Sequence, residues 1–263
     1  MLAAILFAAA VLMLPAPAAL ANPWPQEKGR GFVISTLRYY RADVGPADRN
    51  PARGDGTFQS WSLYEYGEYG LTDATTLGFN LGFEDASVET LTGTDRHHGM
   101  NLAEGFLRQV VWRDGDAVLA VQGLLKLPAG DRDENPPVGD DQVDAELRLL
   151  YGRGLDLRGW SGFLNVEGAY RYRADDPSDQ LRATTTLGLH VAQDWMALFQ
   201  IDNLVSRRGT GPGGWDYDLH TVSLSAVRDL SETWCLQLGV SDDVASRNHA
   251  LGQAVFAAVW MRF

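Results

Sequence analysis

Apolar and polar residues alternate along several short stretches of this chain. In the stretch 142–152, QVDAELRLLYG, apolar side chains occupy the odd-numbered positions and mostly polar ones the even-numbered positions. A period of two is that of a β-strand, whereas an amphipathic helix repeats every 3.6 residues. The same alternation recurs over 76–84, 164–173, 181–191 and 255–263. These stretches predict strands with one apolar face.

Less regular segments of the same kind fill much of the remaining chain. They lie near residues 30–41, 58–69, 101–113, 117–127, 195–205, 219–228 and 234–241. Together with the regular stretches they predict about 12 strands, each near the 9–11 residues that a tilted strand needs to cross a bilayer.

The connections between these strands alternate in length. The short ones, rich in Asp and Gly, are 70–74, 113–117, 156–160, 192–195 and 229–233. The long ones are 42–57, 85–100, 128–141, 174–180, 206–218 and 242–250. Outer-membrane barrels combine short periplasmic turns with longer extracellular loops. The alternative, a soluble β-sandwich, would bury its apolar faces against a second sheet and has no need of this alternation.

The prediction is therefore an all-β chain that forms a single transmembrane, up-and-down antiparallel β-barrel of about 12 strands. The apolar face of each strand meets lipid, and the polar face turns inward. A sheet persists in lipid only when it is closed, because unpaired edge amides find no water there. The last strand, which ends at Phe263, must then pair with the first. A terminal aromatic also resembles the signal that barrel-assembly machinery reads in outer-membrane proteins.

Tyrosines and tryptophans lie mostly near the predicted strand ends, where aromatic girdles mark the two membrane interfaces. They are Tyr39, Tyr40, Trp61, Tyr64, Tyr66, Tyr69, Trp112, Tyr151, Trp160, Tyr170, Tyr172, Trp195, Trp234 and Trp260.

The first residues, MLAAILFAAAVLMLPAPAALA, have the features of a secretory signal peptide over 1–21. Cleavage before Asn22 leaves one domain, the barrel of 22–263. The usual basic start is missing, so the initiating methionine is itself in question. Retention as a transmembrane helix is the alternative, and Pro15 and Pro17 oppose it. No later segment reaches the roughly 18 apolar residues of a spanning helix.

Composition narrows the classes of partner. The formal net charge is −12, which argues against nucleic acid, because phosphate neutralisation needs clustered basic residues. The single cysteine, Cys235, excludes an intramolecular disulfide and metal sites built on paired cysteines. No cofactor is implied.

Three stretches resemble a known family. They are EYGLTDATTLGF (68–79), VVWRDGDAVLAVQGLLKLPAG (110–130) and SRNHALGQAVFAAVWMRF (246–263). They resemble the outer-membrane barrels of the phenol-degradation meta-pathway type, and the resemblance covers most of 22–263. Ser246 stands where the family pattern has a glycine before Arg-Asn. The resemblance implies transport of small solutes, aromatic or hydrophobic ones among them, although a shared fold does not establish a substrate.

The polar faces of the predicted strands supply the candidate lumen residues. These are Glu104, Arg108, Gln122, Lys126, Asp144, Glu146, Arg148, Asn165, Glu167, Arg171, Arg182, His190, Gln200 and Asp202. Neighbouring strands allow ion pairs such as Arg148 with Glu167, or Glu167 with Arg182. The set forms either a charged permeation path or an electrostatic plug. About 12 strands lies between filled 8-stranded barrels and open 16-stranded porins, so barrel size leaves both interpretations open.

Two features suggest metals only weakly. His97 and His98 are adjacent in a polar loop, where such a pair is usually just exposed. The run GDRDENPPVGDD at 130–141 offers carboxylates of the kind that Ca²⁺ binds, without the spacing of an EF-hand. The favoured interpretation is a hydrated surface loop that divalent ions bridge to lipopolysaccharide.

Enzymatic barrels are a rival class. An outer-membrane phospholipase needs a serine beside a histidine on the lipid face, but Ser223 is expected on the face opposite His220. A rim protease would use Asp242, Asp243 and His249, which match no motif. A structural or adhesion barrel is a third possibility.

The sequence thus favours a non-enzymatic channel or transporter in the outer membrane. The expected partners are outer-membrane lipid and lipopolysaccharide, the barrel-assembly machinery, and a small-molecule solute.

Overall fold

The computed structural model describes residues 23–44, 56–90, 93–131, 134–157, 159–174, 177–207 and 216–263. The predicted signal peptide, 1–21, lies outside these residues. Among the described residues there is no helix of sufficient length and hydropathy to span a bilayer. The strands are β1 (Gly31–Val44), β2 (Gly56–Thr72), β3 (Thr75–Thr90), β4 (Gly93–Asp114), β5 (Ala117–Lys126), β6 (Ala129–Asp131), β7 (Val138–Asp140), β8 (Asp144–Leu157), β9 (Trp160–Arg173), β10 (Gln180–Ala192), β11 (Trp195–Ser206), β12 (Asp218–Asp229), β13 (Trp234–Arg247) and β14 (Gly252–Arg262).

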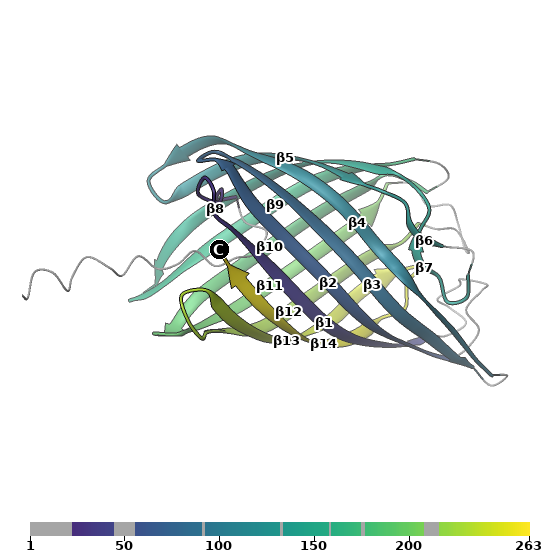
Figure 1. Ribbon diagram of the computed structural model, residues 1–263. Coiled ribbons are helices and arrows are strands. Elements are labelled where there is room, and N and C mark those ends of the chain that lie inside the picture. The colour runs from purple at the N-terminus through teal and green to yellow at the C-terminus, as the bar shows by residue number, and fades with distance from the viewer. Residues whose placement is uncertain are drawn as a thin grey trace, which may run out of the picture.

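Twelve of these strands form one closed antiparallel barrel, as the alternating pattern predicts (Figure 1). Consecutive strands pair around the barrel, and β14 returns to pair with β1 from Phe32 opposite Arg262 to Ala42 opposite Gly252. The remaining two, β6 and β7, form a separate hairpin in the connection between β5 and β8. We call the end of the barrel that carries the tight turns and Phe263 the turn end, and the opposite end the loop end.

Two predicted loops are wrong, because the strands continue past the bilayer. The expected loop 85–100 is almost entirely β3 and β4, which pair down to Thr90 opposite Gly93. Most of the expected loop 242–250 belongs to β13, which ends at Arg247. Outside the bilayer either face of a strand meets water, so the alternation that marks a strand is no longer required there.

The outward face carries the apolar side chains. Along β14, Val255 is 56% exposed and Val259 is 43% exposed, whereas Ala258 and Trp260 are buried. The predicted faces of 142–152 are also correct, since Leu147 is exposed and Glu146 is buried. Exposed apolar side chains on the outside of a closed sheet are what a hydrocarbon solvent requires.

The aromatic girdle is partly confirmed. Trp61, Trp112, Trp160, Trp195 and Trp234 are all exposed. By contrast, Trp260, Tyr66 and Tyr40 are wrongly assigned to the girdle, because they lie in the buried clusters inside the barrel.

The turn end of the barrel is filled by apolar side chains that point inward. We call them the inner apolar cluster: Phe32, Ile34, Phe163, Met196, Leu198, Val227, Cys235, Ala258 and Trp260. Trp260 is fully buried and donates a hydrogen bond from Nε1 to Gln237 at 3.0 Å. The ring of Phe163 occupies the space beside Gly188, where an added Cβ would approach Cε1 to 2.2 Å.

Residues 23–30 cross this end of the barrel on the inside; we call them the N-terminal segment. Pro23 is fully buried and fits against Gly152, and Trp24 packs edge-on against Phe163 with ring centroids 6.3 Å apart. On the far wall, the amide of Gln26 donates to Thr76 Oγ1 at 3.1 Å. Since Gly152, Phe163 and Thr76 all belong to the inner wall, the segment spans the lumen from β8 and β9 to β2 and β3.

One carboxylate stands on the outward face among apolar neighbours. Glu65 pairs directly with Ser35 on β1 and with Leu81 on β3, and residues paired directly in an antiparallel sheet share a face. Ser35 Oγ donates a hydrogen bond to Glu65 Oε2 at 2.8 Å. Along β2, Glu65 lies midway between the outward aromatics Trp61 and Tyr69, where hydrocarbon is expected. An ionisable group there is costly.

We therefore expect Glu65→Leu to raise the free energy of unfolding by about 1 kcal/mol, since an acidic side chain on the lipid face costs less than the 2–4 kcal/mol of a basic one. The measurement is guanidinium unfolding of the folded barrel in lipid vesicles, followed by tryptophan fluorescence. Glu89→Leu, at the loop end of β3, is the matched control and should leave stability unchanged. Destabilisation by Glu65→Leu would show that the carboxylate is not lipid-exposed.

Candidate functional site

Charged side chains line the inner wall formed by β4, β5, β8 and β9. The register places Glu104 opposite Lys126, and Lys126 opposite Asp144. Each strand contributes every second residue to the lumen, so pairs in register stack into rows of alternating charge. Lys126 Nζ contacts Asp140 and lies 3.7 Å from Asp144 Oδ2. The period-two pattern assigns Glu104, Lys126 and Asp144 to the lumen, whereas Asp140 belongs to the expected loop 128–141.

Glu146 is the centre of this wall, because three arginines from three strands converge on it. Arg148 lies 2.7 Å from Glu146 Oε1, and Arg171 Nε lies 2.9 Å from Oε2. Arg182 Nη1 approaches Oε2 to 3.4 Å. The Glu146 side chain has no exposed surface. Three positive charges thus surround one buried negative charge. Balancing the charges of the three arginines requires additional carboxylates nearby.

Two of the three arginines have a second carboxylate. Arg148 Nη1 lies 2.5 Å from Glu167 Oε2, which confirms one of the two predicted cross-strand pairs. Arg171 Nη2 lies 2.7 Å from Glu104. The other predicted pair, Glu167 with Arg182, is wrong: within the described residues Arg182 has Glu146 as its ion-pair partner.

A separate buried pair lies toward the turn end. Arg108 Nη2 is 2.5 Å from Glu68, and both side chains are almost fully buried. Glu68 also accepts hydrogen bonds from Tyr66 and, at 3.1 Å, from Gln26 Nε2 of the N-terminal segment. Arg108 is among the predicted lumen residues, but Glu68 and Tyr66 are not, because they lie in the stretch 58–69, where the alternation is irregular. Through Gln26, this pair connects the charged wall to the N-terminal segment.

The other predicted lumen residues are distributed along the same walls. Gln122 and Asn165 are buried, and His190 is half-buried near the turn end. Gln200 and Asp202 lie on β11, where Gln200 Nε2 donates to Asp202 Oδ2 at 2.6 Å and Thr184 Oγ1 donates to Asp202 Oδ1 at 2.8 Å.

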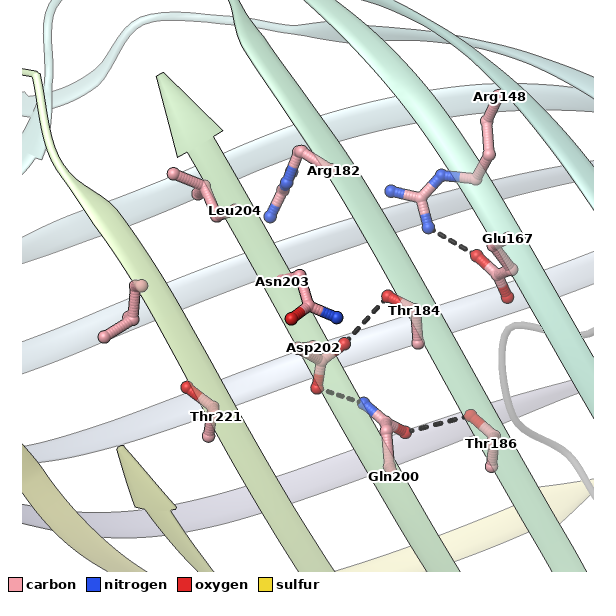
Figure 2. Close-up of a pocket in the computed structure, with 11 residues that line it drawn as sticks. Arg148, Glu167, Arg182, Thr184, Thr186, Gln200, Asp202, Asn203, Leu204 and Thr221 are labelled. Atoms are coloured by element: carbon pink, nitrogen blue, oxygen red, sulfur yellow. Dashed lines mark hydrogen bonds and ion pairs between the residues drawn. The ribbon is translucent and has the colours of Figure 1, made fainter. Parts of the chain in front are cut away.

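A cavity of about 300 Å³ opens on this side of the lumen (Figure 2). It is lined by residues of β8 to β12: Arg148, Glu167, Arg182, Thr184, Thr186, Gln200, Asp202, Asn203, Leu204, Leu219 and Thr221. Figure 2 shows a hydrogen-bonded row, Thr184 to Asp202 to Gln200 to Thr186, along its β10–β11 wall. Six of the lining residues are not among the predicted lumen residues. They are three threonines, two leucines and Asn203, and their uncharged side chains give no signal beyond strand alternation.

The connection between β5 and β8 folds inward at the loop end. Val138 of β7 is fully buried among apolar side chains that include Tyr40 and Phe58. Asp140 is bound by Lys126. The interpretation of 130–141 as a hydrated surface loop is therefore wrong for its second half, while residues 132–133 lie outside the described part of the chain.

The histidine and acid pairs do not assemble metal or catalytic groups in the part of the chain that the structure describes. His97 and His98 lie on β4 rather than in a loop. The His98 ring packs at a tilt against the outward Phe83, and His97 lies opposite the buried Ala86. No described group of three or more His, Cys, Asp or Glu residues is arranged to hold a metal.

The side chains of the two candidate enzyme sites also do not come together. His220 Nδ1 is 2.8 Å from Asn203 Oδ1, while Ser223 pairs with Gln200 on the lumen side. Asp243 is buried and accepts hydrogen bonds from Tyr40 and Thr221, whereas its neighbour Asp242 is exposed. At the rim, the hydrogen bonds from Arg247 hold the pKa of the Asp218 carboxyl below its usual range.

No family model and no curated protein matches the chain by sequence. Solved barrels do match its fold. An outer membrane channel from Pseudomonas putida F1 is 14% identical, covers 94% of this chain and 100% of its own, and has a TM-score of 0.72. The β domain of the Bordetella autotransporter BrkA is 14% identical, with a TM-score of 0.55 over 90% of this chain and 100% of its own. NanC porin is 6% identical, with a TM-score of 0.54 over 88% of this chain and 100% of its own. At these identities the likeness concerns the fold.

We expect Glu146→Gln to lower the free energy of unfolding by about 3 kcal/mol, because removing one partner of a buried ionic cluster leaves its arginines uncompensated. Guanidinium titration in vesicles measures the change. Glu65→Gln, the same chemical change on the outward face, is the control and should not destabilise the barrel. Equal stability of Glu146→Gln and wild type would mean that the arginines are solvated rather than paired.

Proposed function

We propose that this chain is an outer-membrane channel that admits small solutes through the barrel lumen. The observation that carries the proposal is the polar cavity inside a closed barrel, lined by residues of β8 to β12. A buried wall of ion pairs serves stability alone, but a cavity lined by charged and hydroxyl groups also offers a solute a place to enter.

The outer surface supports the location. A band of exposed apolar side chains with tryptophans at its margins suits a bilayer, and alternating turn and loop lengths suit an outer-membrane orientation with the turn end in the periplasm. Among the fold's solved neighbours are an outer membrane channel and a porin. Lipid, lipopolysaccharide and the barrel-assembly machinery are the partners that this location implies.

The channel is closed at its periplasmic mouth in this conformation. The inner apolar cluster and the N-terminal segment together fill the turn end, and Pro23 and Trp260 are fully buried there. Passage of a solute therefore requires the N-terminal segment to move. The first half of the segment is held by Trp24 on Phe163 and by Gln26 on Thr76 and Glu68. Its second half bonds to the β2–β3 turn, where Lys28 donates to Asp73 and Gly29 donates to Gly70.

A second candidate function follows from the same packing. If the inner apolar cluster alone closes the turn end, the barrel is a structural or surface-interaction protein without transport. The two candidates differ in what removal of the N-terminal segment does.

The lining favours polar solutes over the aromatic ones that the family resemblance implies. Nine of the eleven lining residues have hydrogen-bonding side chains, the exceptions being Leu204 and Leu219. Several of these side chains already bond to one another, so the preference comes from the charged groups. An aromatic solute would remove water from Arg182 and Asp202 without offering either a polar partner, which is unfavourable.

We expect single-channel conductance in planar bilayers to rise several-fold when residues 23–29 are deleted, because the mouth then loses its filling. Trp24→Ala should act in the same direction, and Trp61→Ala, on the outward face, is the matched control with unchanged conductance. Folding of each variant is checked by heat-shifted gel mobility. A folded deletion variant that stays silent would exclude the channel and leave the closed barrel.

A further inference from the structure

We propose that the cavity between β8 and β12 is a binding site for a small zwitterion, a molecule that carries one carboxylate and one ammonium group. The proposal rests on the proposed channel function and names the class of solute that the lumen selects. Its basis is a cation and an anion that border the same cavity and do not neutralise each other.

Arg182 supplies the cationic side. Its one ion pair in the described structure is the 3.4 Å approach to Glu146, whose two oxygens are already engaged at shorter range by Arg148 and Arg171. The Arg182 side chain is also 33% exposed, against 15% for Arg148 and 7% for Arg171. A guanidinium has five N–H donors in a fork that matches a carboxylate. Arg182 therefore has donors to offer to a guest.

Asp202 supplies the anionic side. The hydrogen bonds found for it come from neutral donors, Thr184 Oγ1 at 2.8 Å and Gln200 Nε2 at 2.6 Å. No arginine or lysine of the described chain forms an ion pair with it, unlike Glu146 and Glu167 on the same wall. A carboxylate in a narrow lumen, where the effective dielectric constant is below that of water, attracts a cation more strongly than one at the surface.

The two groups are close neighbours in the sheet. Thr184 pairs directly with Asp202 across β10 and β11, and Arg182 pairs with Leu204. Arg182 and Asp202 are thus diagonal neighbours, with Cα atoms roughly 7–8 Å apart by strand geometry. Both line the cavity (Figure 2). Instead of closing on each other, they are held by Glu146 and by Thr184 and Gln200 respectively.

The guest must match this arrangement in charge and size. A carboxylate beside Arg182 and an ammonium beside Asp202 would each form an ion pair with these side chains. The hydroxyls of Thr186 and Thr221 are available to hydrogen-bond other polar atoms of the guest. A cavity of about 300 Å³ is at the lower limit for small-molecule sites, which restricts the guest to the size of an amino acid.

The test is saturation-transfer NMR of the full barrel in detergent, with three probes that differ in one group each. L-threonine carries both charges, 3-hydroxybutyrate lacks the ammonium, and 1-amino-2-propanol lacks the carboxylate. We expect L-threonine to bind about tenfold more tightly than either fragment, because each charge-assisted contact contributes. Equal binding of 3-hydroxybutyrate would reduce the site to an anion site, and equal binding of the amine to a cation site. Either result, or no binding at all, overturns the proposal.

Variants locate the site. Asp202→Asn keeps the shape of the side chain and removes its charge, and Arg182→Gln replaces the guanidinium with a shorter neutral amide; each should weaken L-threonine binding about tenfold. Arg38→Gln is the matched control, an arginine on the inner face of β1 that stacks on Tyr40, and should change nothing. Unchanged binding in both site variants overturns the proposal. The three-probe comparison on the wild-type protein decides the question where a variant does not fold.

Conductance separates this inference from the proposed function. If the barrel without residues 23–29 conducts but L-threonine does not bind, the channel proposal is supported and the zwitterion site is excluded. If L-threonine binds but the barrel never conducts, the site is supported and the channel proposal is excluded.

Discussion

Closure of the sheet between β1 and β14 is the constraint on which every other feature of this molecule depends. At the seam, the amides of Gly31 and Phe263 exchange hydrogen bonds with each other's carbonyls at 2.9 Å. In hydrocarbon, every backbone group must be paired within the protein, so an open edge is not available. Closure then divides the side chains between the lipid on the outer face of the sheet and the lumen on its inner face. Apolar side chains therefore occupy the outer face, and charged side chains gather on the inner face.

Inside the barrel, a narrow lumen makes pairing of charges necessary. On β8 and β9 the acids and bases neutralise one another, with Glu146 shared by three arginines. This wall holds most of the ion pairs of the lumen, although Glu167 Oε1 and the side-chain amide of Asn165 are buried there without a hydrogen-bond partner in the described part of the chain. Toward β11 ion pairs between described residues are fewer, and Asp202 accepts hydrogen bonds from neutral donors. The proposed solute site lies on this second side of the lumen.

The alternating pattern predicted the barrel, its strand number and the direction of Glu146 and Arg148, because a period of two is a property of the strand backbone. Beyond the bilayer the outward face of a strand no longer has to be apolar. The polar strands over 85–100 therefore lack the alternation, and their sequence predicts a loop. Glu68 was missed because 58–69 alternates poorly. Contacts of Trp24 with Phe163 and of Val138 with the loop-end cluster join segments far apart in the chain, and no local pattern encodes them. The incomplete pairing of Arg182 likewise depends on distances, since Arg182 and the doubly paired Arg148 each lie between two apolar residues of an alternating strand.

The route of the N-terminal segment also sets an order of assembly. Gln26 to Arg30 bond to β2 and β3, which follow directly in the chain, but Pro23 and Trp24 pack against β8 and β9, which come much later. Contacts over such separations carry a large loop-closure cost until the intervening strands are in place. The contacts of Pro23 and Trp24 therefore form after most of the barrel. Until then, the turn end lacks the two side chains that these residues contribute to it.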